Sequence, residues 1–426
     1  MKFETPKNSN YAAVVTTIKN LIPLEGCDNV VGTTLFGYQA IVGRDTKIGD
    51  IGLFFPAESQ LSEEYCKQNN LFRHKEFNAD QTKAGYIEDN RRVKAVKFRG
   101  HTSSCLFMPV TSIAGFAGIE DTVKEGDTFD EIDGQEICRK YEVLVNGRAK
   151  GPANQPKMEK RYDTLFIPEH IDTENWWKNE HKVNRDAELI ITAKIHGTSI
   201  RVGNSLVDRK LRLRDILAKA LFGAKIQEKE YAMLYGSKKV IKDINNPNQK
   251  HYYSEDIWTE QGKLLDGLVP EGYVVYAELV GWTPSGKPIQ EGYTYGFEKG
   301  TCGLFVYRIA HINEKGLMVD LSWDQVKQFC TERGLNQVVE LARMPKDKFV
   351  PEEWLDRRFK EEGYFPGQPN PCLPLSDPKT VDEGVCVRVE GLVPQLYKAK
   401  SPKFFEHETA LLDKEVVDME TSGEAA

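Results

Sequence analysis

The chain has 426 residues, of which 40% are hydrophobic and 28% charged, and its formal net charge is -7. This length and composition predict a soluble globular protein of two or three domains. They argue against a membrane-spanning chain, because no stretch approaches the roughly 18 consecutive apolar residues of a transmembrane helix.

The cellular location can be predicted from the eight cysteines and the first residues of the chain. No two cysteines have the spacing Cys-x-x-Cys, which argues against a zinc ribbon or a redox motif. The first residues, MKFETPKNSNYAAVV, lack the apolar core of a signal peptide. We therefore expect reduced thiols and a cytoplasmic protein.

Residues 1–130 are predicted to form an all-β domain. Short runs of β-branched and aromatic residues, such as YQAIVG and IGLFFPA, are separated by turn signals such as GRDTKIGD. Several short strands at this spacing are typical of a small barrel or sandwich. Residues 60–90 are polar and irregular, and we expect a long loop there.

Residues 131–160 are predicted to be a basic linker, because they are polar and carry Gly and Pro in GRAKGPANQPKMEKRYD. Residues 161–405 then mix helical and strand patterns, which predicts a second domain of both element types. The remaining residues, 406–426, lean acidic, and we expect a frayed tail there.

Within the second domain, two segments have helical patterns. Residues 213–225 have apolar side chains at helical spacing, and residues 322–335 begin with the capping-box pair Ser322 and Gln325 and end at Gly334. Five apolar runs are predicted to be strands: 187–195, 272–281, 303–310, 317–321 and 384–391.

Five short motifs of the second domain carry reactive side chains. They are Lys194-Ile195-His196-Gly197, Gly236-Ser237-Lys238, Tyr276-Ala277-Glu278, Glu383 at the start of a strand, and Lys398-Ala399-Lys400. Each motif alone is weak evidence: a lysine at the end of a strand is usually solvated, and a strand tyrosine more often belongs to the core. Glu278 stands among apolar residues, where an unpaired charge would be costly to bury.

Together and in this order, the motifs resemble those of the covalent nucleotidyltransferase superfamily, which includes polynucleotide ligases and mRNA capping enzymes. The spacings fit as well, with 84 residues from Lys194 to Glu278, 105 to Glu383 and 15 to Lys398. The resemblance implies that residues 161–405 form an α+β nucleotidyltransferase domain of antiparallel sheets with helices, an ATP-grasp-like adenylation domain.

The resemblance also implies a role for each residue. Lys194 would be the nucleophile that takes AMP from ATP, with Lys398 and Lys400 supplying positive charge at the phosphates. Its amine must be neutral to attack, and desolvation, nearby cations and a bound metal lower a lysine pKa from about 10.4. Glu383 would hold Mg²⁺ or Mn²⁺. The implied ATP-binding residues are Arg201, Tyr276, Glu278, His196 and Gly197, with Tyr276 stacking on the base.

Two departures from the commonest motifs point to a branch of the superfamily. His196 stands where most relatives have aspartate, and Ala277 where they have glycine. KxHGTS followed by Arg201 resembles RNA ligases more than DNA ligases or capping enzymes. We also expect no C-terminal OB barrel, because only 26 residues follow Lys400. Arg308, in LFVYRIA, is unusual, since the family usually has an acidic residue there.

The first domain resembles the OB module of RNA ligases that carry an OB domain before the nucleotidyltransferase, a group sometimes called family 5. The resemblance is carried by LFGYQAIVGRDTKIGDIGLFFPAESQL and VKAVKFRGHTSSCLFMP. OB barrels bind nucleic acid through basic and aromatic side chains. The residues predicted to contact nucleic acid are Ser237, Lys238, Arg91, Arg92, Lys97 and Arg99.

The resemblance therefore predicts an ATP-dependent RNA ligase. It would seal 3'-OH/5'-phosphate ends through a lysyl-AMP intermediate and an AMP-capped 5'-phosphate, in RNA repair. We expect a monomer that acts on RNA or nicked duplex nucleic acid, with no membrane partner. Three alternatives stay open: a DNA or RNA/DNA nick ligase, a guanylyltransferase, and a non-catalytic nucleic-acid-binding relative.

Overall fold

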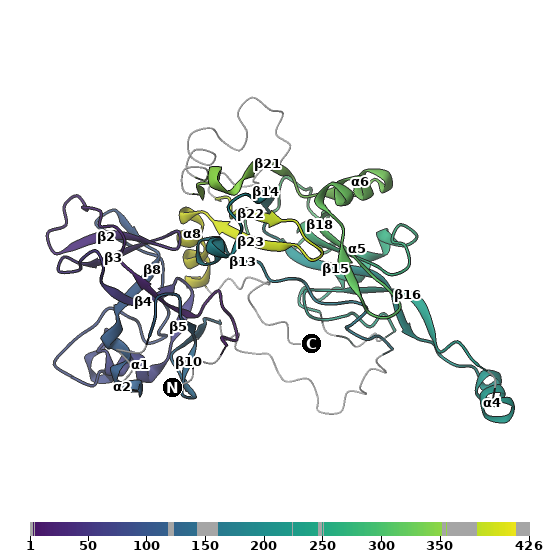
Figure 1. Cartoon of the computed structure of the whole chain (residues 1–426), viewed down its shortest axis with the longest axis horizontal. Coiled ribbons are helices and arrows are strands. Elements are labelled where there is room, and N and C mark those ends of the chain that lie inside the picture. Colours follow the sequence, from purple (N-terminus) through teal and green to yellow (C-terminus); the bar gives the residue numbers. More distant parts are fainter. Residues whose placement is uncertain are drawn as a thin grey trace. The chain divides into compact units, whose positions relative to one another are not determined.

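The computed structural model divides the chain into two compact units (Figure 1). Unit 1 comprises residues 1–143, 174–182 and 398–417, and unit 2 comprises residues 144–173, 183–397 and 418–426. The structure describes residues 3, 5–117, 123–142, 161–223, 225–245, 249, 251–351, 355 and 381–414. Two short segments far along the chain, 174–182 and 398–417, thus belong to the N-terminal unit. No change in the composition of the sequence predicts this assignment.

Unit 1 is built from short antiparallel strands. A four-stranded sheet has the order β8-β4-β1-β9, and the remaining strands pair two by two as β2-β3, β6-β7, β10-β11 and β12-β5. Their bounds are β1 Ala13–Thr17, β2 Val30–Leu35, β3 Tyr38–Gly43, β4 Ile51–Pro56, β5 Ser59–Leu61, β6 Val96–Phe98, β7 His101–Ser103, β8 Cys105–Pro109, β9 Thr128–Phe129, β10 Glu131–Ile132, β11 Gln135–Glu136 and β12 Cys138–Lys140. In the described part of this unit, the strands do not join into one closed sheet.

The central pair of strands in unit 1, β1 and β4, is buried on both faces. Val15, Leu53 and Phe55 point into one hydrophobic cluster, whereas Val14 and Phe54 point into another. Side chains of successive strand residues alternate between the faces of a sheet. Both strands therefore read as continuous apolar runs, as predicted for buried strands.

The sequence analysis predicted none of the seven helical segments described in unit 1. These segments are α1 Glu63–Gln68, η1 Lys75–Phe77, η2 Val110–Ile113, α2 Ala114–Ala117, α3 Trp176–Asn179, η3 Glu180–Lys182 and α8 Pro402–Asp413, and a short strand β13 covers Glu174–Asn175. Helix α1 lies inside the segment expected to be a loop; the Ser62 side chain caps it by accepting from the Tyr65 amide, and Tyr65 is buried. A local cap and one buried aromatic thus order a segment that is polar overall.

The expected start of the acidic tail at residue 406 is wrong. Helix α8 continues to Asp413, because Phe404 and Phe405 are buried and the Ser401 side chain caps its first turn. The predicted linker also begins too early, since residues 131–140 form the last three strands of unit 1. The rest of the tail, from residue 415, and linker residues 143–160 lie outside the described residues.

Unit 2 is built on two mainly antiparallel sheets. The larger has the order β16-β15-β17-β18-β19, with β20 paired parallel to β18, and the smaller includes the order β23-β22-β14-β21. The strands are β14 Glu188–Lys194, β15 Thr198–Asp208, β16 Lys229–Gly236, β17 Tyr273–Gly281, β18 Cys302–Ile312, β19 Met318–Asp320, β20 Asn336–Gln337, β21 Glu340–Pro345, β22 Gly384–Val389 and β23 Gln395–Lys400. The chain passes from unit 2 into unit 1 along β23, after Tyr397.

Two helical segments of unit 2, α4 and α6, lie where the sequence predicts them, whereas α5, η4 and η5 were not predicted. Their bounds are α4 Leu213–Phe222, α5 Ile257–Gly262, η4 Lys263–Leu265, α6 Trp323–Arg333 and η5 Lys346–Lys348. The predicted capping box of α6 is present, with Ser322 and Gln325 each bonding the other's backbone, and Gly334 ends the helix in the left-handed conformation. None of the helices in the described ranges is long and apolar enough to cross a membrane.

One hydrophobic core joins the sheets and helices of unit 2. It contains Ile190 of β14, Val202 of β15, Leu279 of β17 and Val306 of β18, with Trp323 of α6 buried among them. The predicted multidomain fold of antiparallel sheets with helices is thereby confirmed. This core also keeps β14, β15 and β17 close together, and these are the strands that carry the first and third motifs.

Candidate active site

Lys194 ends strand β14, where it lies in register with Gly384 at the start of β22. Its Nζ atom lies 2.8 Å from Oε2 of Glu383, and the two side chains are only 12% and 3% exposed. Burying two charges is costly, and their attraction compensates only when the geometry is close. Lys194 is therefore a buried, paired amine held at a strand end and not a solvated one.

His196 shares the same carboxylate oxygen, with its Nδ1 3.4 Å from Oε2 of Glu383. The His196 amide donates to the Tyr295 hydroxyl at 2.7 Å, and its ring meets the Tyr293 ring edge-on, with centroids 4.7 Å apart. Tyr293 in turn donates to the carbonyl of Val381, two residues before Glu383. An imidazole can approach Glu383 without the repulsion that a second carboxylate would bring, which gives this histidine a physical role.

Glu278 stabilises the turn that follows the lysine. Its carboxylate accepts from the Gly197 amide at 3.1 Å and from the Ser199 hydroxyl at 3.3 Å. Gln290 donates to the Gly197 carbonyl at 3.0 Å, and a Cβ atom at 197 would collide with the backbone oxygen of Leu279. The charge inside the apolar strand β17 is thus hydrogen-bonded, and only glycine allows this close approach of two backbones.

A pocket of about 570 Å³ lies beside the lysine strand. Both neighbours of the lysine in the sequence, Ala193 and Ile195, line it, together with Phe305 of β18, Lys327 of α6 and residues 335–342. This volume is within the range of pockets that bind small molecules, about 300–1,000 Å³. The lining thus offers a ligand one aromatic ring, Phe305, one cation, Lys327, and the polar side chains of Asn336, Gln337 and Glu340.

Comparison with known proteins identifies the family. A model of the RNA ligase family matches residues 187–400, half of the chain, and this range contains all five motifs. The chain belongs to the RNA ligase family. This membership confirms the predicted RNA ligase and its enzyme class, while the narrower group with an N-terminal OB domain stays a prediction. Among curated proteins, none matches the chain significantly.

Solved structures of an RNA ligase from Naegleria gruberi share the fold. The chain is 16% identical to that enzyme with PPi (TM-score 0.59), covering 93% of this chain and 98% of the other. A mutant with AMP and Mn is 15% identical (TM-score 0.58, covering 93% and 98%), and a mutant with ATP and Mn is 14% identical (TM-score 0.57, covering 94% and 99%). The matched part covers most of the chain, so the likeness in fold to that enzyme extends beyond residues 187–400.

Tyr276 does not have the surroundings predicted for a residue that stacks on a base. Its side chain is fully buried, with the Arg308 guanidinium 4.4 Å from the ring centre and the His170 ring edge-on to it. Burial raises the pKa of its hydroxyl to about 12, and this hydroxyl donates to the Pro168 carbonyl. Because both the ring and the hydroxyl are engaged inside unit 2, Tyr276 serves this core and the stacking role is not retained.

The same cluster accounts for the unusual Arg308. It lies opposite Tyr276 on β18 and is ion-paired with Asp320 on the next strand, β19, with both side chains buried. Burying an arginine is tolerated when a carboxylate and an aromatic face accompany it. Arg308 therefore stabilises the sheet and does not face the lysine.

Arg201, Ser237 and Lys238 meet at the turn after β16. Arg201 is 1% exposed and donates to the carbonyls of Ile167 and Lys239, at 3.2 and 3.0 Å. Ser237 is fully buried. Lys238 is a third exposed and lies 3.1 Å from Asp172. Of these three predicted contacts, the Lys238 amine is the one that reaches solvent.

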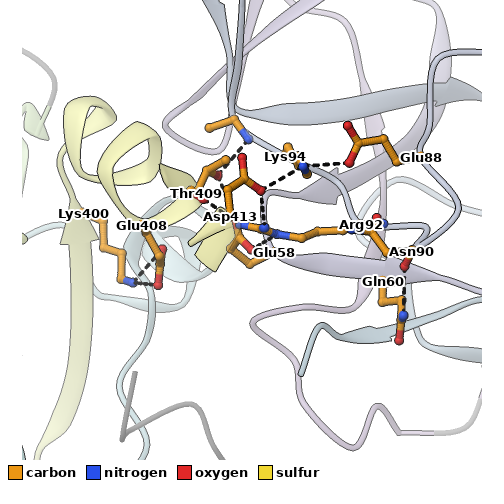
Figure 2. A network of polar contacts seen from close by, with 11 residues as sticks. Glu58, Gln60, Glu88, Asn90, Arg92, Lys94, Lys400, Glu408, Thr409 and Asp413 are labelled. Atoms are coloured by element: carbon orange, nitrogen blue, oxygen red, sulfur yellow. Dashed lines mark hydrogen bonds and ion pairs between the residues drawn. The ribbon is translucent and has the colours of Figure 1, made fainter. Parts of the chain in front are cut away.

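The predicted nucleic-acid contacts in unit 1 differ in exposure. Arg92 is 3% exposed, and Figure 2 shows its guanidinium between Glu58, at 2.5 and 2.9 Å, and Asp413 of α8, at 2.9 Å. Its burial contradicts the predicted role in binding nucleic acid. Lys97 and Arg99 are exposed on the β6-β7 hairpin, although Lys97 pairs with Glu406 and Arg99 donates to a backbone carbonyl. Arg91 is partly exposed, 3.7 Å from Glu63.

Helix α8 follows directly on the strand that carries Lys398 and Lys400. Lys400 Nζ lies 3.2 and 3.3 Å from the two oxygens of Glu408, one and a half turns into that helix, and 4.8 Å from the Phe404 ring centre (Figure 2). Phe405 stacks on Tyr38 of the N-terminal strands, with ring centroids 4.2 Å apart. The last predicted motif is thereby anchored in unit 1.

Four residues of the site were missed by the sequence analysis: Tyr293, Tyr295, Gln290 and Phe305. The two tyrosines sit in GYTYG, a glycine-rich stretch without strand or helix periodicity, where two bulky rings two residues apart could have signalled a packed loop. Phe305 could not be told from the core residues around it, since its neighbours in the strand, Leu304 and Val306, are apolar as well.

Proposed function

We propose that the protein joins 3'-OH and 5'-phosphate ends of RNA at the expense of ATP, with Lys194 as the covalent nucleophile. The observation that carries this proposal is the buried pair of Lys194 and Glu383 at the end of β14, beside a pocket of nucleotide size. The buried contacts of His196, Gly197 and Glu278 support it, because they hold the turn that aims the amine.

The chemistry follows from the amine. Nζ of Lys194, once neutral, attacks the α-phosphorus of ATP; a P–N bond forms, the bond to the β-phosphate oxygen breaks, and pyrophosphate leaves while the amine loses its second proton. A 5'-phosphate oxygen of RNA then takes the AMP and frees the lysine. The 3'-OH finally attacks that 5'-phosphate, and AMP leaves. Lys398 and Lys400 would stabilise negative charge on the transferring phosphates.

The residues present fit a divalent cation. Glu383 offers a buried carboxylate oxygen, the ligand that Mg²⁺ and Mn²⁺ prefer, and such ions are often bound by one or two carboxylates plus substrate phosphates. Consistently, no group of three or more His, Cys, Asp or Glu forms a ready-made cage among the described residues. When bound, the ion would supply positive charge that favours the neutral form of the neighbouring amine.

We further propose that the pocket beside Lys194 takes the adenine of ATP. Phe305 would provide the stacking surface in place of Tyr276, and Asn336 and Gln337 would provide hydrogen-bond partners for the base edge. The pocket borders the strand of the nucleophile through Ala193 and Ile195, the residues on either side of Lys194 in the sequence.

For unit 1 we propose an OB-type module that binds the RNA. The support is the β6-β7 hairpin, which exposes Lys97, Phe98 and Arg99 in a row. Alternating cations and an aromatic face suit phosphates and unstacked bases. Lys238 of unit 2 is proposed as a further phosphate contact. All seven cysteines of the described residues are free thiols, which supports a reducing, cytoplasmic location.

Labelling with ATP that carries a radioactive α-phosphate tests the proposal. With Mg²⁺ or Mn²⁺ present, we expect a labelled protein band that disappears in Lys194→Ala and persists in Lys263→Ala, a matched change at an exposed lysine. Label from GTP alone would favour a guanylyltransferase, and label retained in Lys194→Ala would show that the nucleophile is another residue. Sealing assays with RNA or DNA on either side of the break then define the substrate.

The pocket has its own test. Phe305→Ala is expected to raise the KM for ATP in the labelling reaction roughly tenfold, with a smaller effect on the maximal rate, because a stacking contact is lost in ground and transition states alike. Phe77→Ala, at a half-exposed phenylalanine of unit 1, is the control. An unchanged KM in Phe305→Ala would place the base elsewhere.

A further inference from the structure

Helix α4 projects from unit 2 on a two-stranded stalk. Strands β15 and β16 pair up to Asp208 and Lys229, and the chain between them forms α4, Leu213–Phe222, at the tip (Figure 1). A helix of ten residues has little stability by itself in water, because isolated helices shorter than about 12–15 residues are marginal. The helix therefore needs a surface on which to pack.

The apolar side of α4 is uncovered. Five large apolar residues are exposed, to between 48% and 83%: Leu213, Ile216, Leu217, Leu221 and Phe222. The first four are spaced i, i+3, i+4 and i+8, which puts them on one face of a helix. The sequence predicts this helix from that spacing, yet the face that normally enters a core is presented outward. We call these five residues the α4 stripe.

The surroundings of the α4 stripe are basic. Residues 209–225 contain six Lys or Arg and a single acidic residue, Asp215. Asp215 is engaged locally, accepting from Arg209 at 3.2 Å, and Lys219 pairs with Glu228 on the stalk. Lys210, Arg212, Arg214 and Lys225 are exposed. The tip thus combines an apolar stripe with an excess of positive charge on its borders.

This combination limits what can cover the stripe. A second copy of the helix would bring the same positive charge, and two ten-residue helices would bury much less than the roughly 1,200 Å² of a stable interface. RNA would satisfy the cations but leave the apolar stripe in water. The covering surface must be both apolar and anionic, and a convex tip at the end of a stalk can lie flat on a planar surface.

We propose that α4 binds the surface of an anionic lipid bilayer. The α4 stripe enters the boundary between headgroups and acyl chains, while Arg212, Arg214 and their basic neighbours contact lipid phosphates. Peripheral binding of this kind needs no membrane-spanning helix. It would place the enzyme at a membrane and leave its catalytic residues unaltered, so it stands independently of the proposed reaction.

Vesicle co-sedimentation tests this inference with the full-length protein, without ATP or RNA. We expect the protein to sediment with phosphatidylcholine vesicles that contain phosphatidylserine, and much less with phosphatidylcholine alone. The double variant Leu217→Asp/Phe222→Asp should need roughly tenfold or more lipid for half-maximal binding, because it places carboxylates in the apolar boundary. Raised salt should weaken binding by the wild type, since the electrostatic part is screened.

Two further variants keep the test decisive. Ile48→Asp, at an exposed isoleucine of unit 1, is the matched control and should bind as the wild type does. Replacing residues 210–226 by an Asn-Gly turn removes α4 while leaving the β15-β16 pairing, and it should abolish binding but not RNA sealing in solution. Absence of vesicle binding, or equal binding by the α4 variants, overturns the inference. So does a dimer, RNA complex or protein complex that depends on the α4 stripe in the absence of vesicle binding.

Discussion

Two of the buried ion pairs, one taken from each unit, use different cations. In unit 2 the Lys194 amine meets Glu383 at 2.8 Å, and in unit 1 the Arg92 guanidinium meets Glu58 at 2.5 and 2.9 Å and Asp413 at 2.9 Å (Figure 2). Both carboxylates are almost completely buried, with side chains 3% and 5% exposed. In each pair the charges lose water and depend on each other.

The two cations differ in whether they can lose a proton. A guanidinium stays charged in proteins and offers five donors in a plane, so Arg92 can hold two carboxylates and the Thr409 carbonyl at once. Burial raises the pKa of Glu58 while Arg92 lowers it, which makes this carboxylate dependent on its partner. A lysine amine can lose its proton when its surroundings change, and only then can it become a nucleophile. The arginine pair is suited to a structural role, in which it holds α8 in place. The lysine pair is suited to a catalytic role.

The sharpest way to test the contrast is to exchange the cation at position 194. Lys194→Arg keeps a positive charge beside Glu383 but removes the amine, so protein labelling from ATP should fall by roughly a thousandfold or more. Its thermal unfolding should stay close to that of the wild type, whereas Lys194→Met should lower Tm because Glu383 is left buried without its cation. Labelling of Lys194→Arg would contradict the assignment of the nucleophile.

Breaking the arginine pair should affect stability instead. Arg92→Met leaves Glu58 buried without its cation, and we expect the free energy of unfolding from urea titration to fall by about 3–5 kcal/mol. Lys97→Met is the control: its pair with Glu406 is exposed on the lysine side, and such pairs contribute about 0–1 kcal/mol. The specific labelling activity of folded Arg92→Met should be retained. An equal free energy of unfolding for the two variants would show that only apolar packing holds α8 against the rest of unit 1.

The smallest expected effect concerns a partly buried cation of unit 1, Lys178. Its amine lies over the Phe54 ring and donates to the Ser9 carbonyl, and burial, with a contribution from the charge of Lys398, lowers its pKa to about 7. The unfolded chain keeps that proton up to its ordinary pKa near 10.5, so the unfolded state binds more protons between pH 7 and 10.5 and stability should rise with pH there. Lys178→Met should flatten that rise in urea titrations; an unchanged slope would contradict the lowered pKa.

Much of the fold could be predicted because its signals are local. Helix α6 carries its own capping box and terminal glycine, and strands β14, β17, β18 and β22 are apolar runs whose bounds differ from the prediction by a residue or two. Helix α1 was missed because its signal is a single cap in a polar segment. The extent of α8 was missed because two phenylalanines outweigh an acidic composition.

The sequence predicted many of the residues of the candidate site, but it did not predict which of them contact each other. The order of the motifs predicted that Lys194, Glu278 and Glu383 belong to one site. The structure shows that Glu383 pairs with the lysine, while Glu278 accepts a hydrogen bond from the turn that follows it. Tyr276 and Arg92 were assigned to ligands, yet both are buried among protein groups. A residue type states what chemistry a side chain can do, but burial and partners decide whether it is available.

The sequence by itself determined the family motifs, helices α4 and α6, strands such as β14 and β17, and the apolar face of α4, because these depend on residue type and short-range periodicity. Only the tertiary structure decided what covers each face and which charges meet. Arg92 and Asp413 are 321 residues apart, and the local sequence around either residue does not predict their contact. The same limit applies to α4, whose apolar stripe looks like a core face in the sequence and proves to be exposed. Periodicity specifies a surface, whereas its partner depends on the path of the whole chain.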